Sequence, residues 1–405
     1  MLPIFRGIRP CQSRQQGMSL VEVMVASVVG MLTVLAVTQT MSFSETQRRA
    51  TTGSGDVQSN VALATYLLER EARMAGYGVF ANDANFINQC MRGNVVGYNS
   101  GRAPNDIAFA FDDVPFVPVA INPPGIPAGD AGSDVVGVAF STSGIGLAGI
   151  GARIGIDNGA GVTVANSAGF VAGDLALAVS ATAGATCSIY EITDGPGAVH
   201  CSGAGVSASL QYGQANYQSR HHACASIPPT RNKPGGLGVN TAVYTDTGRL
   251  YNLGRREGLT HAYYAVRGER LVRCDHYRSD CSADEGLNDE QIWTPVSDGI
   301  VALRAEFGIS STGDAGAVDT WRSTVCAAAN CNPTQADWNN LRVMRLALVG
   351  RSQQPAGAGT TAAAPTWGGQ EAIDLSGLGE NWGSFRYVKT EVVIPLRNIV
   401  WGSTS

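Results

Sequence analysis

Cysteine is the residue type in this chain with the most distinctive chemistry, because thiols form disulfides or bind metal ions. The 405-residue sequence contains nine cysteines. Cys11 stands apart near the N-terminus, and without it the count is even, as complete disulfide pairing needs. The remaining eight are Cys90, Cys187, Cys201, Cys224, Cys274, Cys281, Cys326 and Cys331.

The spacing of these cysteines suggests a pairing but leaves the connectivity open among roughly a hundred complete arrangements. Short loops favour the pairs Cys326–Cys331, Cys274–Cys281 and Cys187–Cys201. Subtraction then leaves the pair Cys90–Cys224.

Zinc is the alternative use of these thiols. Four histidines lie near cysteines in the sequence: His200, His221, His222 and His276. No CxxC pair, a common spacing of zinc-binding cysteines, occurs. We therefore expect disulfides in an oxidising compartment, and neither a metal ion nor another cofactor.

Other sequence patterns give little support to nucleotide, calcium or catalytic chemistry. Residues 144–149 match GxGxxG, but with 50 glycines in 405 positions such a match is expected by chance. Asp284, Glu285, Asp289 and Glu290 lack the EF-hand order of calcium ligands, which favours a solvated loop. No G-x-S-x-G or H-E-x-x-H motif occurs, and we expect no enzyme activity.

The charge of the chain limits its partners. Acids outnumber bases by 33 to 28, the formal net charge is −5, and only two of the bases are lysines. We therefore expect no general electrostatic attraction to nucleic acid. A local basic patch stays open as an alternative, with the candidate residues Arg267, Arg270, Arg273 and Arg278.

An isolated acid, Glu22, precedes a long apolar segment. The 22 residues 23–44 carry no charge, and as a helix they would extend roughly 33 Å, enough to cross a membrane. Three arginines and no acid precede Met18, which orients the N-terminus to the cytoplasm. An acid in a membrane span is costly without a partner, so Glu22 predicts an assembly in which a neighbouring subunit supplies a cation.

This N-terminus resembles the type IV prepilin signal, which has a basic leader ending in glycine, a retained apolar helix and a glutamate at the fifth mature position. The resemblance implies that a prepilin peptidase cuts after Gly17, the last leader residue. Met18 would then be the N-methylated mature N-terminus and Glu22 the assembly glutamate. Met18 departs from the phenylalanine with which major pilins usually begin.

A second helical segment is expected downstream. Apolar residues from Val57 to Ala75 recur at steps of three and four, and two glycines at 76 and 78 predict the helix end. Residues 67–77 resemble a segment of the PilW minor pilins, whose type II secretion counterpart is the pseudopilin GspJ. Residues 293–307, 341–352 and 385–398 resemble later PilW segments, whereas residues 100–255 show almost no resemblance.

The rest of the chain has the patterns of strands and loops. Residues 262–266 and 271–274 predict a hairpin, and residues 300–309 and 388–394 predict half-buried strands. Further strands are expected within four windows of the Gly-rich middle: 106–111, 134–141, 174–180 and 242–245. Residues 352–369 have the composition of a flexible surface loop.

These observations predict an α+β, type IV pilin-like fold, with a long N-terminal membrane-spanning helix packed on an antiparallel β-sheet body that has long Gly-rich loops. The expected parts are a leader at 1–17, a long helix at 18–76 and a periplasmic or extracellular body at 77–405. The helix divides into an assembly half at 18–45 and an amphipathic half at 56–76. A subdivision of the body near 240–260 stays open.

The resemblance implies a structural minor pilin that takes part in priming type IV pilus assembly at or near the tip, supporting twitching motility and adhesion. The implied partners are prepilin peptidase, other minor pilins, the major pilin, the inner membrane and a tip adhesin. The chain would be a single-pass inner-membrane protein before assembly and part of the extracellular pilus afterwards. A GspJ-type pseudopilin, a DNA-binding or adhesive minor pilin and an anchored periplasmic enzyme are the alternatives.

Overall fold

The computed structural model describes residues 17–81, 83–92, 95–100, 108–110, 114–142, 152–157, 161–165, 167, 169–182, 187–194, 201, 209–213, 215–230, 232, 248–283, 287, 289–313, 316–328, 331–368 and 371–402. The chain forms two compact units, residues 1–53 and residues 54–405.

Helix α1 runs from Leu20 to Met74 and belongs to both units. In the second unit its buried residues recur every three or four positions, as the sequence predicts: Val57, Val61, Ala64, Leu68 and Ala72. Gly76 follows the helix with a φ of 83°, the left-handed conformation that glycine adopts at helix C-termini. The amphipathic pattern and its glycine stop thus give the expected helix.

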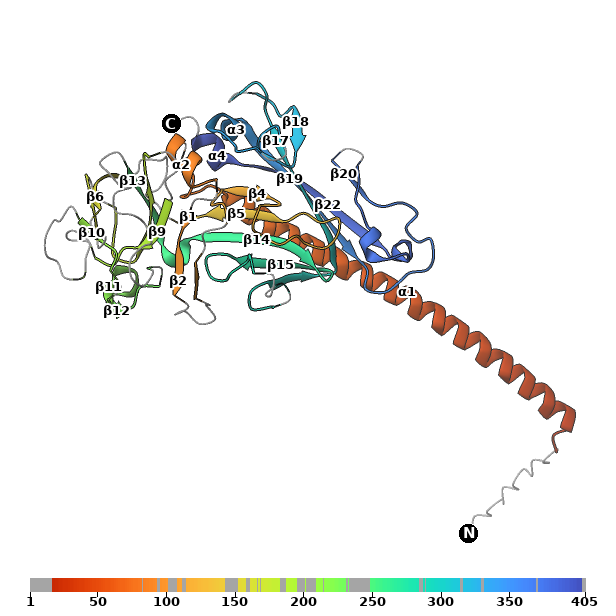
Figure 1. Ribbon diagram of the computed structural model, residues 1–405. Coiled ribbons are helices and arrows are strands. Elements are labelled where there is room, and N and C mark those ends of the chain that lie inside the picture. The colour runs from red at the N-terminus through yellow and green to blue at the C-terminus, as the bar shows by residue number, and fades with distance from the viewer. Residues whose placement is uncertain are drawn as a thin grey trace, which may run out of the picture. The chain divides into compact units, whose positions relative to one another are not determined.

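A four-stranded antiparallel sheet packs against the second half of α1 (Figure 1). Its strands, in spatial order, are β18 (Thr320–Arg322), β17 (Ile300–Ile309), β19 (Leu341–Arg351) and β22 (Tyr387–Pro395). A Cβ on Gly350 would come within 2.4 Å of Val61 Cγ2 and 2.9 Å of Val57 Cγ1. Helix and sheet approach this closely because glycine has no side chain.

A five-stranded antiparallel sheet shares one apolar core with α1 and the four-stranded sheet. Its strands, in spatial order, are β16 (Thr294–Asp298), β15 (Arg270–Asp275), β14 (Thr260–Arg267), β5 (Val136–Phe140) and β4 (Val119–Ile121). Strands β14 and β15 form the predicted hairpin. Gly268 and Glu269 in its turn have φ values of 56° and 61°, as a two-residue type I′ turn requires.

A seven-stranded sheet contains most strands of the Gly-rich middle. Its order is β1 (Val95–Val96), β9 (Cys187–Glu191), β8 (Asp174–Val179), β13 (Arg249–Arg255), β6 (Ala152–Asp157), β7 (Gly161–Val164) and β10 (Ser209–Gln211). Only β1 and β9 pair in parallel among the described strands of this sheet. One face packs around Phe170, Tyr190 and Tyr212 in a second apolar core.

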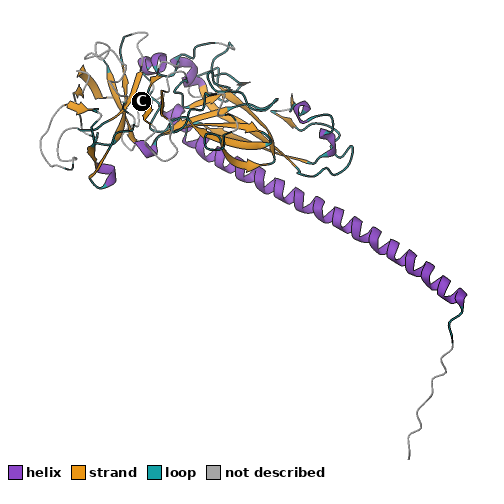
Figure 2. Cartoon of the chain, turned by 60° about the horizontal axis from the view of Figure 1, so that its bottom comes forward, coloured by secondary structure: helices purple, strands orange, loops and turns teal. Residues whose placement is uncertain are grey.

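The remaining elements are short. Three two-stranded pairs are β2 (Tyr98–Ser100) with β3 (Ala108–Ala110), β11 (Tyr217–Ser219) with β12 (Ala225–Ile227), and β20 (Thr366–Trp367) with β21 (Glu371–Ala372). Besides α1, the described residues form the α-helices α2 (Ala84–Gln89), α3 (Gln335–Asn340) and α4 (Arg397–Gly402). The 3-10 helices within the described ranges are η1 (Arg220–His222), η3 (Arg256–Gly258), η5 (Ser376–Leu378) and η6 (Trp382–Ser384). Figure 2 shows that strands dominate the body, which confirms the α+β fold with antiparallel sheets.

Three of the four strand windows expected in the Gly-rich middle contain a strand, namely β3, β5 and β8. The fourth, 242–245, and the GxGxxG segment at 144–149 lie outside the described residues. The loop expected at 352–369 includes β20, and its Trp367 is buried beside Val301 and Val349 in a small apolar cluster. Part of this segment therefore belongs to the core, which its composition did not predict.

Candidate functional site

The expected cleavage site lies directly before α1. Gly17, Met18 and Ser19 precede the helix without regular structure, and Met18 exposes 69% of its surface. No described atom lies within 4 Å of the position that a Cβ on Gly17 would take. Within the described part of the chain, the Gly17–Met18 bond is therefore open to a peptidase.

The helix segment Leu20–Glu45 is long and apolar enough to cross a membrane, with a hydropathy of 2.4, and its most apolar stretch has no buried residue. Large apolar side chains are exposed at closely spaced positions along it, so its surface is apolar all round. The hydroxyls of Ser27, Thr33 and Thr38 donate to main-chain carbonyls one turn earlier in the helix. They need no water, which suits a segment covered by lipid or by other helices.

Glu22 lies in the first turn of α1, where the helix dipole favours a negative charge. Its side chain is exposed and makes no hydrogen bond or ion pair with any residue that the structure describes. Residues of the leader lie outside that part. A partner for this carboxylate within a membrane or a helix bundle would have to come from another molecule.

The second half of α1 is held to the body by polar contacts from distant parts of the chain. Glu71 pairs with Arg273 of β15 at 3.3 Å. Asn60 donates to the carbonyl of Asp298 at 3.1 Å. At the helix end, Asn398 Nδ2 donates to three carbonyls at 3.2–3.3 Å, those of Arg73, Met74 and Ala75.

These contacts explain how the body fixes the C-terminal end of α1. The last carbonyls of a helix have no partner inside the helix, and the Asn398 amide supplies one. Sequence reasoning missed both Asn398 and Arg273 in this role. The residues that they contact are about two hundred or more positions away, and no local pattern marks such pairs.

The structure joins the eight cysteines in four disulfides: Cys90–Cys187, Cys201–Cys224, Cys274–Cys281 and Cys326–Cys331. The last two agree with the pairing that short loops favour. The pairs Cys187–Cys201 and Cys90–Cys224 are wrong.

The reason for the error is the direction of β9. Cys187 opens this strand beside β1, which follows α2 and Cys90 in the chain, and the Cα atoms of Cys90 and Cys187 are 5.4 Å apart. Cys201 follows the other end of β9, a strand about 13 Å long, and is bonded to Cys224. Cys187 is therefore bonded to Cys90 through the pairing of β9 with β1, a neighbour that the spacing of the cysteines does not show.

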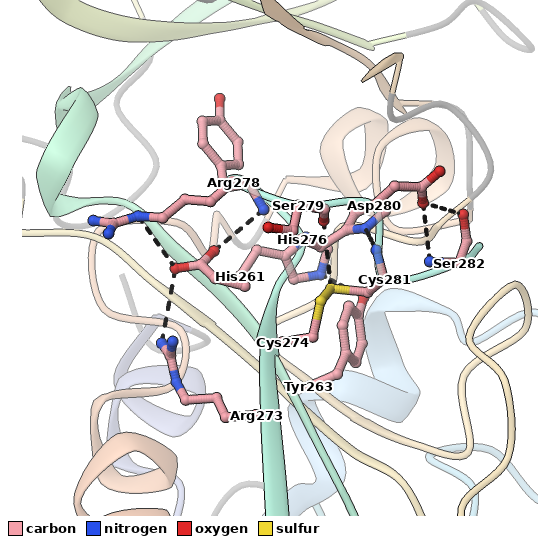
Figure 3. Close-up of a disulfide and its surroundings, with 12 residues drawn as sticks. His261, Tyr263, Arg273, Cys274, His276, Arg278, Ser279, Asp280, Cys281 and Ser282 are labelled. Atoms are coloured by element: carbon pink, nitrogen blue, oxygen red, sulfur yellow. Dashed lines mark hydrogen bonds and ion pairs between the residues drawn. A yellow bond between two sulfur atoms is a disulfide. The ribbon is translucent and has the colours of Figure 1, made fainter. Parts of the chain in front are cut away.

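The Cys274–Cys281 disulfide closes a loop that holds a buried histidine (Figure 3). The ring nitrogen Nδ1 of His276 accepts a hydrogen bond from the backbone N–H of Cys281 at 3.3 Å. The backbone N–H of His276 donates to the backbone carbonyl of His261. Tyr263 Oη lies 2.6 Å from His261 Nε2. Burial lowers the pKa of His276 to about 4 and holds the pKa of His261 well below its usual value.

The described side chains do not support the hypothesis of a zinc site or of a calcium site. No group of three or more potential metal ligands occurs among them. His221 Nε2 instead lies 2.7 Å from the buried carboxylate of Asp174, and Glu290 pairs with Arg270 at 2.8 Å. His200, Asp284 and Glu285 lie outside the described residues.

Ser219, His222 and Glu257 form a chain of contacts that resembles a catalytic triad, and sequence reasoning missed it. Ser219 Oγ is 3.0 Å from His222 Nδ1, and His222 Nε2 is 3.5 Å from Glu257. Ser219 is completely buried, so its hydroxyl cannot meet a substrate. The arrangement joins η1 to η3 and has the character of a structural contact.

The four arginines of the candidate basic patch all have partners within the body. Arg270 pairs with Glu290, and Arg273 and Arg278 both approach the carboxylate of Asp275. Arg267 donates to a carbonyl and lies 4.5 Å from the ring centre of Trp293. Arginines that already have partners in this way give little support to nucleic-acid binding.

Comparisons with known proteins agree with these features at both ends of the chain. Residues 267–398 match the family model described as type IV pilus-assembly protein W, and residues 12–38 match the prokaryotic N-terminal methylation motif. The resemblance to PilW minor pilins and to the prepilin signal is confirmed. No curated protein matches the chain significantly.

A type IV-like pilin from Thermus thermophilus is among the similar solved structures. It is 10% identical to this chain, and the alignment covers 84% of this chain and 96% of that one, with a TM-score of 0.28. No conclusion rests on a likeness of this size. The two family matches support a type IV pilus-related minor pilin of the PilW type, and pilins are structural proteins.

Proposed function

From these family matches we propose that the protein is a minor pilin that helps to start type IV pilus assembly, at or near the pilus tip, in support of twitching motility and adhesion. The observation that carries the proposal is the exposed apolar segment of α1 with Glu22 at its start. Such a segment is stable only in lipid or among other helices.

Processing comes first in this proposal. Before assembly, the chain crosses the inner membrane once with its N-terminus in the cytoplasm. Prepilin peptidase hydrolyses the Gly17–Met18 bond, and the new amino group of Met18 is methylated. The open position of this bond ahead of α1 supports such a cut.

Glu22 then recruits the next subunit. The N-terminal ammonium group of an incoming pilin pairs with the Glu22 carboxylate as the apolar helices pack side by side. A charge pair is strong in such surroundings because little water competes with it. The absence of a partner for Glu22 among the described residues supports this role.

The size of the body supports a place at the tip. Residues 54–405 form a single compact unit fixed to the second half of α1. A large body needs lateral room that close-packed helices along a shaft restrict. At the tip no subunits lie above it, and a tip adhesin or other minor pilins would have access to its surface.

The test is the Glu22→Ala variant in the native host. Mass spectrometry should still find cleavage after Gly17, and the amount of folded protein should be normal. Surface pili and twitching should fall sharply, because breaking a buried charge pair costs about 3–5 kcal/mol. Glu45→Ala is the matched control, because Glu45 is an acid at the other end of the same apolar segment. It should leave pili at normal numbers.

Deletion of the gene separates priming from accessory roles. We expect pili and twitching to be lost while the major pilin stays in the membrane. Normal pilus numbers in the deletion strain would refute priming and favour an accessory or adhesive role.

The match to the pilus-assembly W family favours a pilus over a type II secretion system. Lost secretion with normal twitching would place the chain in a secretion system.

A further inference from the structure

A groove of about 440 Å³ lies along β4, which is the edge strand of the five-stranded sheet among the described residues. Val119, Ala120 and Ile121 of β4 form one wall. Neighbouring residues of a strand point to opposite faces, so a groove lined by all three follows the edge of the strand and not one face of the sheet. The opposite wall consists of Phe307, Trp338 and the loops at 323–326 and 331–333.

The hydrogen bonds of β4 show which of its backbone groups face this groove. The N–H of Asn122 donates to Val135 O at 2.8 Å, and the N–H of Ala139 donates to Pro118 O at 2.9 Å. Residues 118 and 122 therefore pair with β5, as does residue 120 between them. In an antiparallel ladder the intervening residues turn their backbone groups to the other side.

Val119 and Ile121 thus direct their N–H and C=O groups away from β5, towards the groove. No described residue forms a backbone hydrogen bond with these four groups. Both residues are nevertheless buried, at 1% and 9% exposure. Buried backbone groups are almost always paired, because leaving one unpaired costs about 1–3 kcal/mol. Four such groups in a row are the template for another strand.

The charge of the groove limits which strand fits. Arg92 is exposed on the rim, and its one described contact is a long one of 3.5 Å to the carbonyl of Pro333. The other residues that line the groove are uncharged. A strand with small apolar side chains facing Phe307 and an acid at one end would match both the walls and Arg92.

We propose that this groove binds an extended strand of a partner protein, which adds to the five-stranded sheet at β4 and places an acidic residue beside Arg92. The strand would satisfy the outward groups of Val119 and Ile121, as in other cases of strand addition to a sheet edge. The Cys326–Cys331 disulfide holds the opposite wall in place. The proposal does not depend on the priming role or the position in the pilus.

The probe is a labelled peptide with blocked ends and the sequence Asp-Val-Thr-Val-Thr-Val-Asp, added to the full chain in detergent micelles. We expect saturable binding by fluorescence anisotropy. Two further peptides carry N-methyl groups on all the valines or on all the threonines. One set of amides faces β4 and the other faces outward, so one methylated peptide should bind at least tenfold more weakly and the other should bind normally.

Variants of the protein locate the site. Ser323→Trp fills the groove from an exposed position and should weaken binding at least tenfold. Ala327→Trp is the matched control, because Ala327 is exposed on the same loop but does not line the groove. Arg92→Glu should weaken binding of the acidic peptide and strengthen binding of a peptide with lysine in place of both acids. Hydrogen exchange at Val119 and Ile121 should slow when the peptide binds.

Several outcomes would overturn the proposal. These are no binding at about 1 mM peptide, equal binding of the two methylated peptides, and full binding to Ser323→Trp. Competition by decanoate with equal affinity would make the groove a site for lipid chains. Self-association that Ser323→Trp abolishes, without peptide binding, would make a second copy of this chain the occupant.

Discussion

At the scale of single residues, two acids on α1 show how surroundings decide the role of a carboxylate. Glu71 is half-buried and meets the guanidinium of Arg273 from β15, so its charge is compensated inside the protein. Glu22 has no such partner among the described residues and lies at the start of an apolar segment. The first acid fixes the helix to the body, whereas the second is available to another molecule.

The buried pair His261 and His276 makes stability depend on pH. Both pKa values are lowered by burial, that of His276 to about 4, whereas the unfolded chain binds a proton near pH 6.5. Between these values the unfolded state binds more protons, so stability falls as pH falls. Each histidine contributes a slope of up to about 1.4 kcal/mol per pH unit.

His276→Asn should reduce this slope by about one histidine's share, roughly 1 kcal/mol per pH unit between pH 6 and pH 5. Asparagine retains an acceptor for the Cys281 N–H but does not titrate. Urea unfolding of the full chain at several pH values measures how the free energy of unfolding changes with pH. Near pH 8 both histidines are neutral in both states, so the difference in free energy between variant and wild type there reports the loss of packing alone. A slope equal to that of the wild type would show that His276 is protonated equally in both states.

At the scale of elements, the two halves of α1 follow different rules. Residues 54–74 bury one stripe against the sheets, whereas the stretch from Leu20 to Glu45 has no buried face within its most apolar part. Helical propensity alone cannot hold such a helix in water, since most helical stability comes from packing. The first half therefore needs lipid or other helices, and the second half needs only its own body.

Gly350→Ala should weaken the contact between α1 and β19. The added methyl group would lie 2.4 Å from Val61 Cγ2, and overpacking of this kind costs about 1–3 kcal/mol. Urea unfolding should show this loss, and the additional change Val61→Ala should recover part of it by making room. Gly55→Ala is the control, because nothing lies within 4 Å of that position. Equal stability of Gly350→Ala and the wild type would contradict the close approach.

At the scale of the whole body, the disulfides connect parts that are distant in sequence as well as parts that are adjacent. Cys90–Cys187 spans 97 positions and ties α2 to the seven-stranded sheet. Cys274–Cys281 spans only seven and closes a local loop. The longer link restricts the unfolded chain far more, because the entropy of loop closure grows with loop length.

Removal of the long-range disulfide should therefore cost more stability than removal of the local one. Loop entropy predicts a loss of about 4.7 kcal/mol for Cys90→Ala with Cys187→Ala, against about 2.4 kcal/mol for Cys274→Ala with Cys281→Ala. Urea unfolding of both double variants gives the comparison. The reverse order would mean that packing at Cys274, and not loop entropy, dominates.

All eight of these cysteines should be oxidised in the protein purified from its host. Thiol labelling of denatured, unreduced protein should find close to no free thiol among the eight. Peptide mapping should recover Cys90 joined to Cys187 and Cys201 joined to Cys224. Two or more free thiols, or bound zinc in stoichiometric amount, would contradict the disulfide framework.

Local periodicity in the sequence predicted several elements correctly. The apolar stripe of α1, the β14–β15 hairpin and strand β17 each depend on residues a few positions apart, and their patterns of burial and turn formation can be read without the rest of the chain. The apolar segment after Glu22 also depends on composition alone. These features carry the expectation of a membrane helix joined to a β-rich body.

Tertiary structure alone decided the contacts between distant residues. Cys90 pairs with Cys187 because strand order brings α2 beside the start of β9, and Asn398 caps α1 from more than three hundred positions away. The open edge of β4 likewise depends on which strands pair and which remain unpaired. No spacing in the sequence encodes these neighbours, because they follow from how whole sheets pack and not from any local period.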